Sequence, residues 1–536
     1  MVALMTAKDI QLKEQRDLIA EQRQVINALN KALTTSNTQT EELTKQIKLL
    51  NEQLEYLKKK LFGTSSERRN LISEEQLSLF NEAEIESEEK HEVPEIEQEV
   101  KRHNRRRKTT LAEKIKGIPV EQIICDLETD KTCDICGTDL IKIGQEIVRR
   151  ELEYIPAQVK ILEYVSLHYT CPECKQTDES YFEKAIVPKG LLKHSIASSS
   201  SVAWVMYQKY ANGLPLYRQE KDWKQYGIAL SRATMANWMI YCASNYLKPL
   251  YDYLHKMLLK RDVVMADETR VQVLKEDGRS AESNSYMWVY RSGEDELAPI
   301  ILFKYTQTRA GYNATSFLDG YSGYLMTDGY SGYNLLTAVK RCCCWSHIRR
   351  YFNDAIPKGY EYDLSIPAVQ GVEFCNKLFS YEKQFKEKQY TPEKRKEQRL
   401  IKEKPILDAF WSWLNQQTPD RNSRFHKAVQ YAQNRKLYLE TYLEDGRCSL
   451  SNNLTENTIR PFTIGRKGWL FCDTPKGAEA SAIVYSFVEM AKANGLNIYN
   501  YLNYLLSVIP SSAMNDDVFA NIVPWSENIK TKFTNE

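Results

Sequence analysis

The feature that most constrains the fold is an alternation of apolar runs between residues 261 and 349. Strand-forming residues fill 262–273, then SYMWVYRS, then PIILFKY, and then the short run that ends at Asp328. Helical patterns cover 312–318 and the residues after Asp328, and 341–345 is a further strand candidate. Three successive strands, followed by strands joined through helices, predict a mixed β-sheet flanked by helices. The cysteines at 342–344 are expected to pack in this sheet as small apolar side chains.

Three acidic residues occupy informative positions in this pattern. Asp267 lies inside the first strand, Asp328 ends a later one, and Glu456 follows a plausible helix start at 451–453. If the three converge, their oxygens can hold two Mg²⁺ ions roughly 4 Å apart and leave coordination positions for a phosphate. An Asp at a strand end is also an ordinary cap or turn residue. The spacing alone therefore leaves a metal site and simple capping both open.

Two Cys-x-x-Cys pairs lie upstream of this region, Cys133 with Cys136 and Cys171 with Cys174. Each pair places two thiolates on one side of a tight turn, and four thiolates suit tetrahedral Zn²⁺. The residues between the pairs are rich in strand formers, so a ribbon can bring the second pair beside the first. A redox function is the weaker alternative, because redox motifs occur singly beside a βαβ unit. Cys125 and His168 lie nearby but are not expected to be ligands.

Between residues 214 and 243 the pattern predicts a helix, a turn at Gly227 and a second helix capped by Ser231. This is the arrangement of a helix-turn-helix, in which the second helix enters the DNA major groove. Arg232, Thr234 and Asn237 are the exposed candidates for contacts. An ordinary helical hairpin in a core has the same pattern, so both interpretations stay open.

The first sixty residues carry an apolar seam at steps of four and three, through Leu43, Ile47, Leu50, Leu54, Leu57 and Leu61. This heptad pattern predicts a coiled coil, and self-association is favoured over packing on the rest of the chain. An acidic stretch at 82–99 predicts a disordered linker. The basic run 101–108, with Arg105, Arg106 and Arg107, can lie along DNA phosphates or be held by the acidic run beside it.

Residues 361–440 have long charged stretches and predict a helical insertion between Asp328 and Glu456. Basic residues flank this insertion in the sequence. His347, Arg349 and Arg350 come after the last strand, and Arg460, Arg466 and Lys467 come after Glu456. They can clamp the phosphates of a polyanionic substrate that carboxylates alone would repel, or form a surface network of salt bridges.

Composition limits the class of protein. With 536 residues and 42% hydrophobic residues, the chain has room for three or four globular domains. It contains no run of about 18 to 20 apolar residues and no signal-peptide pattern, so we expect no membrane span and a cytoplasmic location. The net charge of +2 gives no global attraction for nucleic acid, so DNA binding must come from local basic segments.

Together, these motifs resemble the insertion sequence 66 family of DDE transposases over roughly residues 43 to 505. The resemblance is carried by the following segments in a fixed order: KKKLFGTSSER, the paired Cys-x-x-Cys motifs, GLPLYRQE, LSRATMANW, ADET, TDGYSGYN, CWSHIRRYF, DGRCSLSNNLTENTIRPFTIGRKGWLF and GAEASAIVYSFVEMAKANG. A small departure is Gly468, where the family usually has Asn.

The resemblance implies a multidomain α/β protein with a ribonuclease H-like mixed-sheet catalytic domain. The expected segments are a coiled coil at 1–63, a linker at 64–115, a zinc ribbon at 116–190, a helix-turn-helix domain at 191–255, a catalytic core at 256–360 and 441–495 interrupted by the helical insertion 361–440, and a C-terminal segment at 496–536. The same resemblance makes Asp267, Asp328 and Glu456 the metal-binding triad.

The implied activity is Mg²⁺-dependent cleavage and strand transfer of DNA, with two Mg²⁺ or Mn²⁺ ions and one structural Zn²⁺ per chain. The implied partners are the terminal repeats of the element, target DNA and further copies of the chain, on the bacterial nucleoid. Whether the element's accessory proteins take part is left open. The alternative is a catalytically inactive DNA-binding regulator derived from a transposase.

Overall fold

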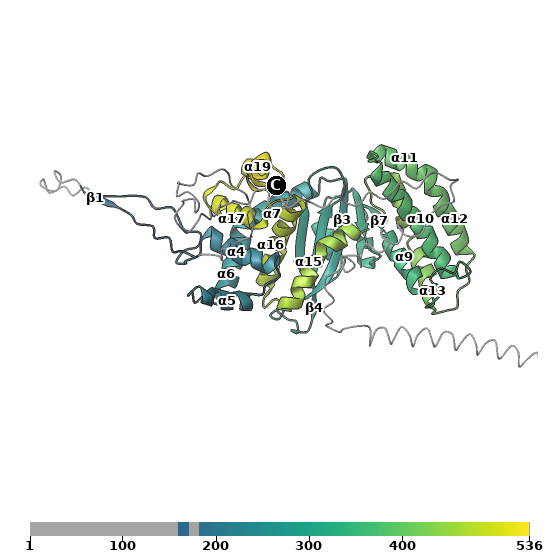
Figure 1. Cartoon of the computed structure of the whole chain (residues 1–536), viewed down its shortest axis with the longest axis horizontal. Helices are drawn as coiled ribbons and strands as arrows, with labels where there is room; N and C mark the ends of the chain where they lie inside the picture. The colour runs from purple at the N-terminus through teal and green to yellow at the C-terminus, as the bar shows by residue number, and fades with distance from the viewer. Residues whose placement is uncertain (1–158, 171–181, 535–536) are drawn as a thin grey trace, which may run out of the picture. The chain divides into compact units, whose positions relative to one another are not determined.

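A computed structural model of the chain describes residues 159–170 and 182–534 (Figure 1). The predicted coiled coil, linker and basic run, and all four proposed zinc ligands, lie outside these residues. The first described element is a two-stranded antiparallel hairpin formed by β1 (His168–Thr170) and β2 (Phe182–Lys184).

The helices that follow begin where the sequence supplies caps. Ser198 caps α4 (Ser199–Tyr210) in a reciprocal capping box with Ser201. Ser231 accepts a hydrogen bond from the N–H of Thr234 and so caps α6. The elements here are α5 (Leu216–Gln225), α6 (Arg232–Cys242), the π-helical turn η3 (Ala243–Leu247) and α7 (Lys248–Leu258). Gly227 adopts a φ of +79° between α5 and α6, so the predicted helix, glycine turn and helix are confirmed as local structure.

A five-stranded sheet has the order β5-β4-β3-β6-β7. Its strands are β3 (Val263–Gln272), β4 (Asn284–Ser292), β5 (Ile301–Thr306), β6 (Tyr324–Thr327) and β7 (Lys340–Cys343). The strands β3, β4 and β5 are successive antiparallel neighbours. The predicted strands are therefore confirmed, with one difference at β7. It ends at Cys343, because Cys344 takes the N-cap position of the next helix and Trp345 begins that helix.

One face of β4 is covered by α8, which follows β5, and by η4, which follows β6. Tyr290 stacks on Phe317 of α8 (Tyr312–Phe317), with ring centroids 4.0 Å apart. Trp288 meets Tyr333 of the 3₁₀ turn η4 (Ser331–Leu335) edge to face, at 5.8 Å. These aromatic pairs close one face of the sheet and leave the other for the C-terminal helices.

After β7 every regular element up to residue 444 is helical. The elements are α9 (Trp345–Asp354), α10 (Pro367–Glu387), α11 (Pro392–Lys402), α12 (Lys404–Asn415), α13 (Arg424–Gln433), α14 (Lys436–Glu440) and η5 (Thr441–Glu444). They gather as the green bundle in Figure 1, around an aromatic centre in which Phe410 contacts Trp345, Phe352 and Trp411.

The last part of the chain is also helical. It contains α15 (Asn453–Trp469), α16 (Pro475–Ala493), α17 (Ile498–Val508), η6 (Ile509–Ser511), α18 (Asp516–Ile522) and α19 (Glu527–Phe533). The helix α16 is buried along most of its length and joins the sheet to the N-terminal helices. Ser486 accepts the N–H of Phe303 on β5 at 2.8 Å, and Ser481 shares a 3.1 Å hydrogen bond with Tyr210 of α4.

Candidate active site

The first predicted acid, Asp267, lies in the middle of β3. Its Oδ1 accepts a hydrogen bond from the N–H of Glu268 at 2.8 Å, which fixes the orientation of the carboxylate. The antiparallel register pairs Met265 with Arg291 and Asp267 with Val289. Directly paired residues point to the same face of a sheet, so Asp267 and Arg291 share a face.

The neighbouring acid, Glu268, points to the opposite face of the sheet and accepts hydrogen bonds there. Arg309 donates to it through Nε at 2.7 Å, and the Tyr333 hydroxyl donates to it at 2.6 Å. The Glu268 side chain is only 1% exposed. This pairing makes Glu268 a structural carboxylate on the face opposite to Asp267.

The helix α15 crosses the face that carries Asp267. At its start, Arg291 donates to the Oγ1 of Thr458 at 2.7 Å and to the carbonyl of Leu454 at 3.4 Å. Towards its other end, Arg466 donates to the Oγ1 of Thr269 at 3.3 Å. Thr269 is two residues from Asp267 and points to the same face. Figure 1 shows α15 lying over β3 in this way.

Glu456 lies between the two contacts of Arg291, in the first turn of α15, and is 5% exposed. Glu456 therefore belongs to the helix that crosses the face carrying Asp267. Its spacing of two residues from Leu454 and Thr458 directs its side chain to the other side of that helix. Arg291 was missed by the sequence reasoning, although an arginine at the end of the apolar run YMWVY is a detectable signal of a half-buried, paired cation.

The second acid, Asp328, directly follows β6, which is the neighbour of β3 in the sheet order. Its Oδ1 accepts the N–H of Tyr330 at 2.9 Å, two residues along the chain. This local hydrogen bond forms an Asx-type turn, which the strand-end position of Asp328 suggested.

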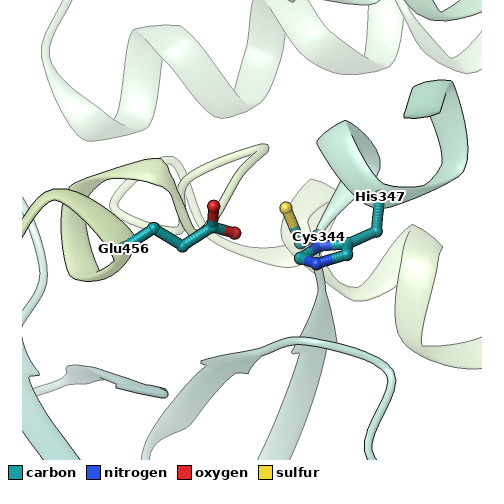
Figure 2. A group of neighbouring side chains, drawn as sticks. All are labelled: Cys344, His347 and Glu456. Carbon is teal, nitrogen blue, oxygen red and sulfur yellow. The ribbon is translucent and has the colours of Figure 1, made fainter. Parts of the chain in front are cut away.

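Cys344 and His347 add a second type of ligand chemistry. The main-chain N–H of Asn452 donates to the sulfur of Cys344 at 3.2 Å, and α15 begins at the next residue. One ligand atom from each of Cys344, His347 and Glu456 lies within 4.8 Å of the others, and the Glu456 carboxylate points towards Cys344 (Figure 2). A thiol, an imidazole and a carboxylate suit Zn²⁺ better than Mg²⁺, whereas carboxylates alone suit Mg²⁺. Burial raises the pKa of the adjacent Cys343 to about 11, so that thiol packs as a neutral group.

The predicted basic residues differ in how accessible they are. Lys467 and Arg350 are exposed, whereas Arg460 and Arg466 are half-buried. Burial lowers the pKa of Arg466, which still leaves it charged at neutral pH. Arg349 departs from the expectation of a DNA contact. It is 3% exposed, and its Nε donates to Asn376 of α10 at 2.8 Å, so it fastens α9 to α10.

The helical pair α5 and α6 presents a small basic and aromatic surface. Arg232 and Asn237 are exposed, and Thr234 is half-buried beside its cap. Tyr217 of α5 is 52% exposed, and two cations approach its ring, Lys221 at 4.6 Å and Arg232 at 6.0 Å. Sequence reasoning missed Tyr217 and Lys221, although they lie four residues apart on one helix face.

The comparisons with known proteins agree with this architecture. Residues 194–480, more than half of the chain, match the sequence profile described as "Transposase IS66 family". The chain belongs to the IS66 transposase family. Residues 130–175 match the zinc-finger binding domain of this family's transposases, and this range contains all four predicted thiolate ligands. Residues 49–123 match the profile "Transposase C of IS166 homeodomain", and this range includes the whole stretch 64–115 that was predicted as a linker.

Three relatives from Sinorhizobium fredii (strain NBRC 101917 / NGR234) are similar over most of their length. The uncharacterized protein y4qI is 27% identical over 88% of this chain and 88% of its own. The uncharacterized protein y4jD is 25% identical over 91% of this chain and 96% of its own. The uncharacterized protein y4hP is 24% identical over 74% of each. Within the described part of this transposase-family chain, no helix is both long and apolar enough to cross a membrane.

Proposed function

We propose that this chain is a DDE transposase in which Asp267, Asp328 and Glu456 hold two Mg²⁺ or Mn²⁺ ions. The observation that carries the proposal is the path of α15, which lies on the face of the sheet that carries Asp267 and has Glu456 in its first turn. Three carboxylates offer the hard oxygen ligands that Mg²⁺ requires. In this structure the ligand atoms that lie within 4.8 Å of Glu456 are those of Cys344 and His347, so the proposal requires the three acids to draw together around the ions. Bound there, the ions would activate the attacking hydroxyl and stabilise the leaving oxygen of a phosphodiester.

The proposed reaction has two steps of the same type. A water first hydrolyses a phosphodiester at the end of the element and frees a 3′-hydroxyl. This hydroxyl then attacks a phosphodiester of target DNA in line, forming a new P–O bond while the target's own 3′-oxygen leaves as a hydroxyl. No side chain acts as a nucleophile in either step. Arg350, Arg460, Arg466 and Lys467 would bind phosphates beside the acids, and Arg349 is omitted because it is buried. His347 would position phosphate or hold Glu456.

The sheet supports a ribonuclease H-like fold as part of this proposal. Its first three strands are antiparallel neighbours, and two later strands extend it beyond β3 through helical connections. Asp267 is on β3, and Asp328 directly follows β6, which is the neighbour of β3 in the sheet order. The helices α5 and α6 would read terminal-repeat DNA, with contacts from Arg232, Thr234, Asn237 and, outside the described residues, Arg105, Arg106 and Arg107.

Three single substitutions test the proposed triad. Asp267→Asn, Asp328→Asn and Glu456→Gln should each abolish Mg²⁺-dependent cleavage of end DNA, because each removes an anionic ligand with little change in shape. End-DNA affinity, measured by fluorescence anisotropy, should stay within about twofold, since none of the three is a phosphate-binding residue. Lys530→Gln, an exposed change on α19, is the control and should cleave normally.

Normal cleavage by any one acid variant, with Mg²⁺ or Mn²⁺, would remove that residue from the triad. End-DNA binding by the natural chain without any metal-dependent cleavage would instead favour the inactive regulator.

A further inference from the structure

Two guanidinium groups hold the turn that follows β6. Arg341 of β7 donates through Nε to the Oγ1 of Thr327 at 3.1 Å, and through Nη2 to the carbonyls of Asp328 and Tyr330 at 3.0 and 2.9 Å. Arg435, between α13 and α14, donates through Nη2 to the carbonyl of Gly329 at 2.6 Å. Each residue from 327 to 330 thus gives one acceptor to an arginine.

Arg435 is itself held in a fixed position. Its guanidinium carbon lies 3.7 Å from the ring centroid of Tyr431, and its Nη1 donates to the Tyr431 carbonyl at 3.1 Å. Tyr431 in turn stacks on Tyr351 of α9, with ring centroids 4.2 Å apart and an interplanar angle of 21°. A planar cation stacked on an aromatic ring loses little further entropy when it donates to the turn.

The turn approaches the Arg435 guanidinium so closely that only glycine fits at position 329. A Cβ at Gly329 would lie 2.2 Å from the Nε of Arg435 and 2.3 Å from the Tyr431 hydroxyl, closer than atoms can approach. Arg341 is also braced from the helical segment, because its guanidinium carbon lies 5.0 Å from the ring centroid of Tyr438 in α14. The helical segment 367–440 therefore places Tyr431, Tyr438 and Arg435 beside the turn that contains Asp328.

We propose that Arg435 is a positioning residue for Asp328, and that the long helical segment orders the active-site turn through it. This inference rests on the proposed function, because it requires Asp328 to be a metal ligand. The guanidinium of Arg435 fixes the Gly329 carbonyl, Arg341 fixes the carbonyls on either side, and the Tyr330 N–H then orients the Asp328 carboxylate. Outer groups that orient a ligand in this way typically contribute about 10- to 100-fold to metal affinity.

The test measures metal binding directly, on the full chain, by electron paramagnetic resonance of Mn²⁺. Arg435→Gln should weaken Mn²⁺ binding by about tenfold or more and raise the Mn²⁺ concentration for half-maximal cleavage in parallel. End-DNA affinity should not change. Lys436→Gln is the matched control, because the ammonium of this exposed neighbour lies over the ring of Trp411, 5.2 Å from its centroid, and this variant should bind Mn²⁺ normally.

Two more variants keep the test decisive if Arg435→Gln does not fold. Arg435→Lys keeps the charge and the apolar stem but lacks the planar fork, and Gly329→Ala pushes the turn away from Arg435. Both should weaken Mn²⁺ binding in the same direction. Normal Mn²⁺ affinity in a folded Arg435 variant would overturn the inference.

Asp328→Asn separates the two proposals. If this change weakens Mn²⁺ binding and abolishes cleavage while folded Arg435 variants behave as the natural chain does, only the positioning role fails. If Asp328→Asn itself changes neither Mn²⁺ binding nor cleavage, the proposed function fails at this residue.

Discussion

Arg291 shows how a single half-buried cation can hold a helix against a strand. Burial lowers its pKa to about 10, which still leaves it charged at neutral pH. Its hydrogen bonds to Thr458 and Leu454 offset part of the desolvation cost and fix the first turns of α15 against β4. Glu294 and Glu489 oppose this lowering of the pKa of Arg291.

Glu489 of α16 gives a prediction about stability and pH. Burial raises its pKa from 4.5 to about 7, although Lys492 and Arg291 act in the opposite direction. The folded chain therefore keeps this proton between pH 4.5 and 7 while the unfolded chain releases it. The stability that Glu489 contributes is complete below pH 4.5, falls as pH rises to 7, and stays low above that.

Glu489→Gln should consequently raise the free energy of unfolding at pH 8 by up to about 3 kcal/mol, because Gln is never ionised. The gain should shrink towards zero at pH 4.5. Urea denaturation followed by tryptophan fluorescence at both pH values measures it. An equal gain at both pH values, or a loss at pH 8, would show that Glu489 is not a buried acid of raised pKa.

At the scale of elements, one ion-pair network holds the helical bundle together. Arg399 of α11 is fully buried and donates to both oxygens of Glu382 on α10, at 2.6 and 2.9 Å. It also donates to the carbonyls of Tyr442, Asp445 and Cys448, which lead towards α15. This segment lies so close to α11 that a Cβ at Gly446 would be 1.8 Å from the Pro392 carbonyl oxygen.

Arg399→Leu should therefore destabilise the chain by about 3 kcal/mol, because it removes the buried partner of Glu382 and the donor to three carbonyls. Arg395, which donates to the same carboxylate at 2.6 Å, keeps Glu382 partly paired. Lys394→Leu on the same helix is the control. Its ion pair with Glu397 is exposed, so the expected change is below about 1 kcal/mol. Thermal unfolding compares the two variants, and similar shifts in both would show that the network is not a stabilising centre.

The sequence predicted those elements that depend on local patterns. The strand around Asp267, the cap at Ser231 and the helix start before Glu456 all follow from residue types within a few positions. The face that Asp267 shares with Arg291 depends on strand register, and the bond from Arg435 to Gly329 spans 106 residues. No local pattern encodes such a pairing. The burial of Arg349 was missed for the same reason, because its partner Asn376 lies on another helix.

At the scale of the whole molecule, the family profiles match separate segments of the chain. The profile matches place a zinc-finger binding domain at 130–175 and the family's transposase region at 194–480. The proposed zinc ligands, Cys133, Cys136, Cys171 and Cys174, lie before every acid of the proposed triad. Zinc and the catalytic metal should therefore be lost independently, by different substitutions.

This independence gives the last prediction. The purified chain should contain about one zinc per molecule, and Cys171→Ala should lower this to well below one, because three thiolates hold Zn²⁺ less tightly than four. Cys375→Ala is the control, since burial raises the pKa of Cys375 to about 12 and makes it a neutral core side chain. Asp267→Asn should keep its zinc while losing cleavage. Plasma emission spectrometry measures the metal content, and full zinc in Cys171→Ala would exclude four-thiolate ligation. Loss of zinc in Asp267→Asn would instead show that the two metal sites depend on each other.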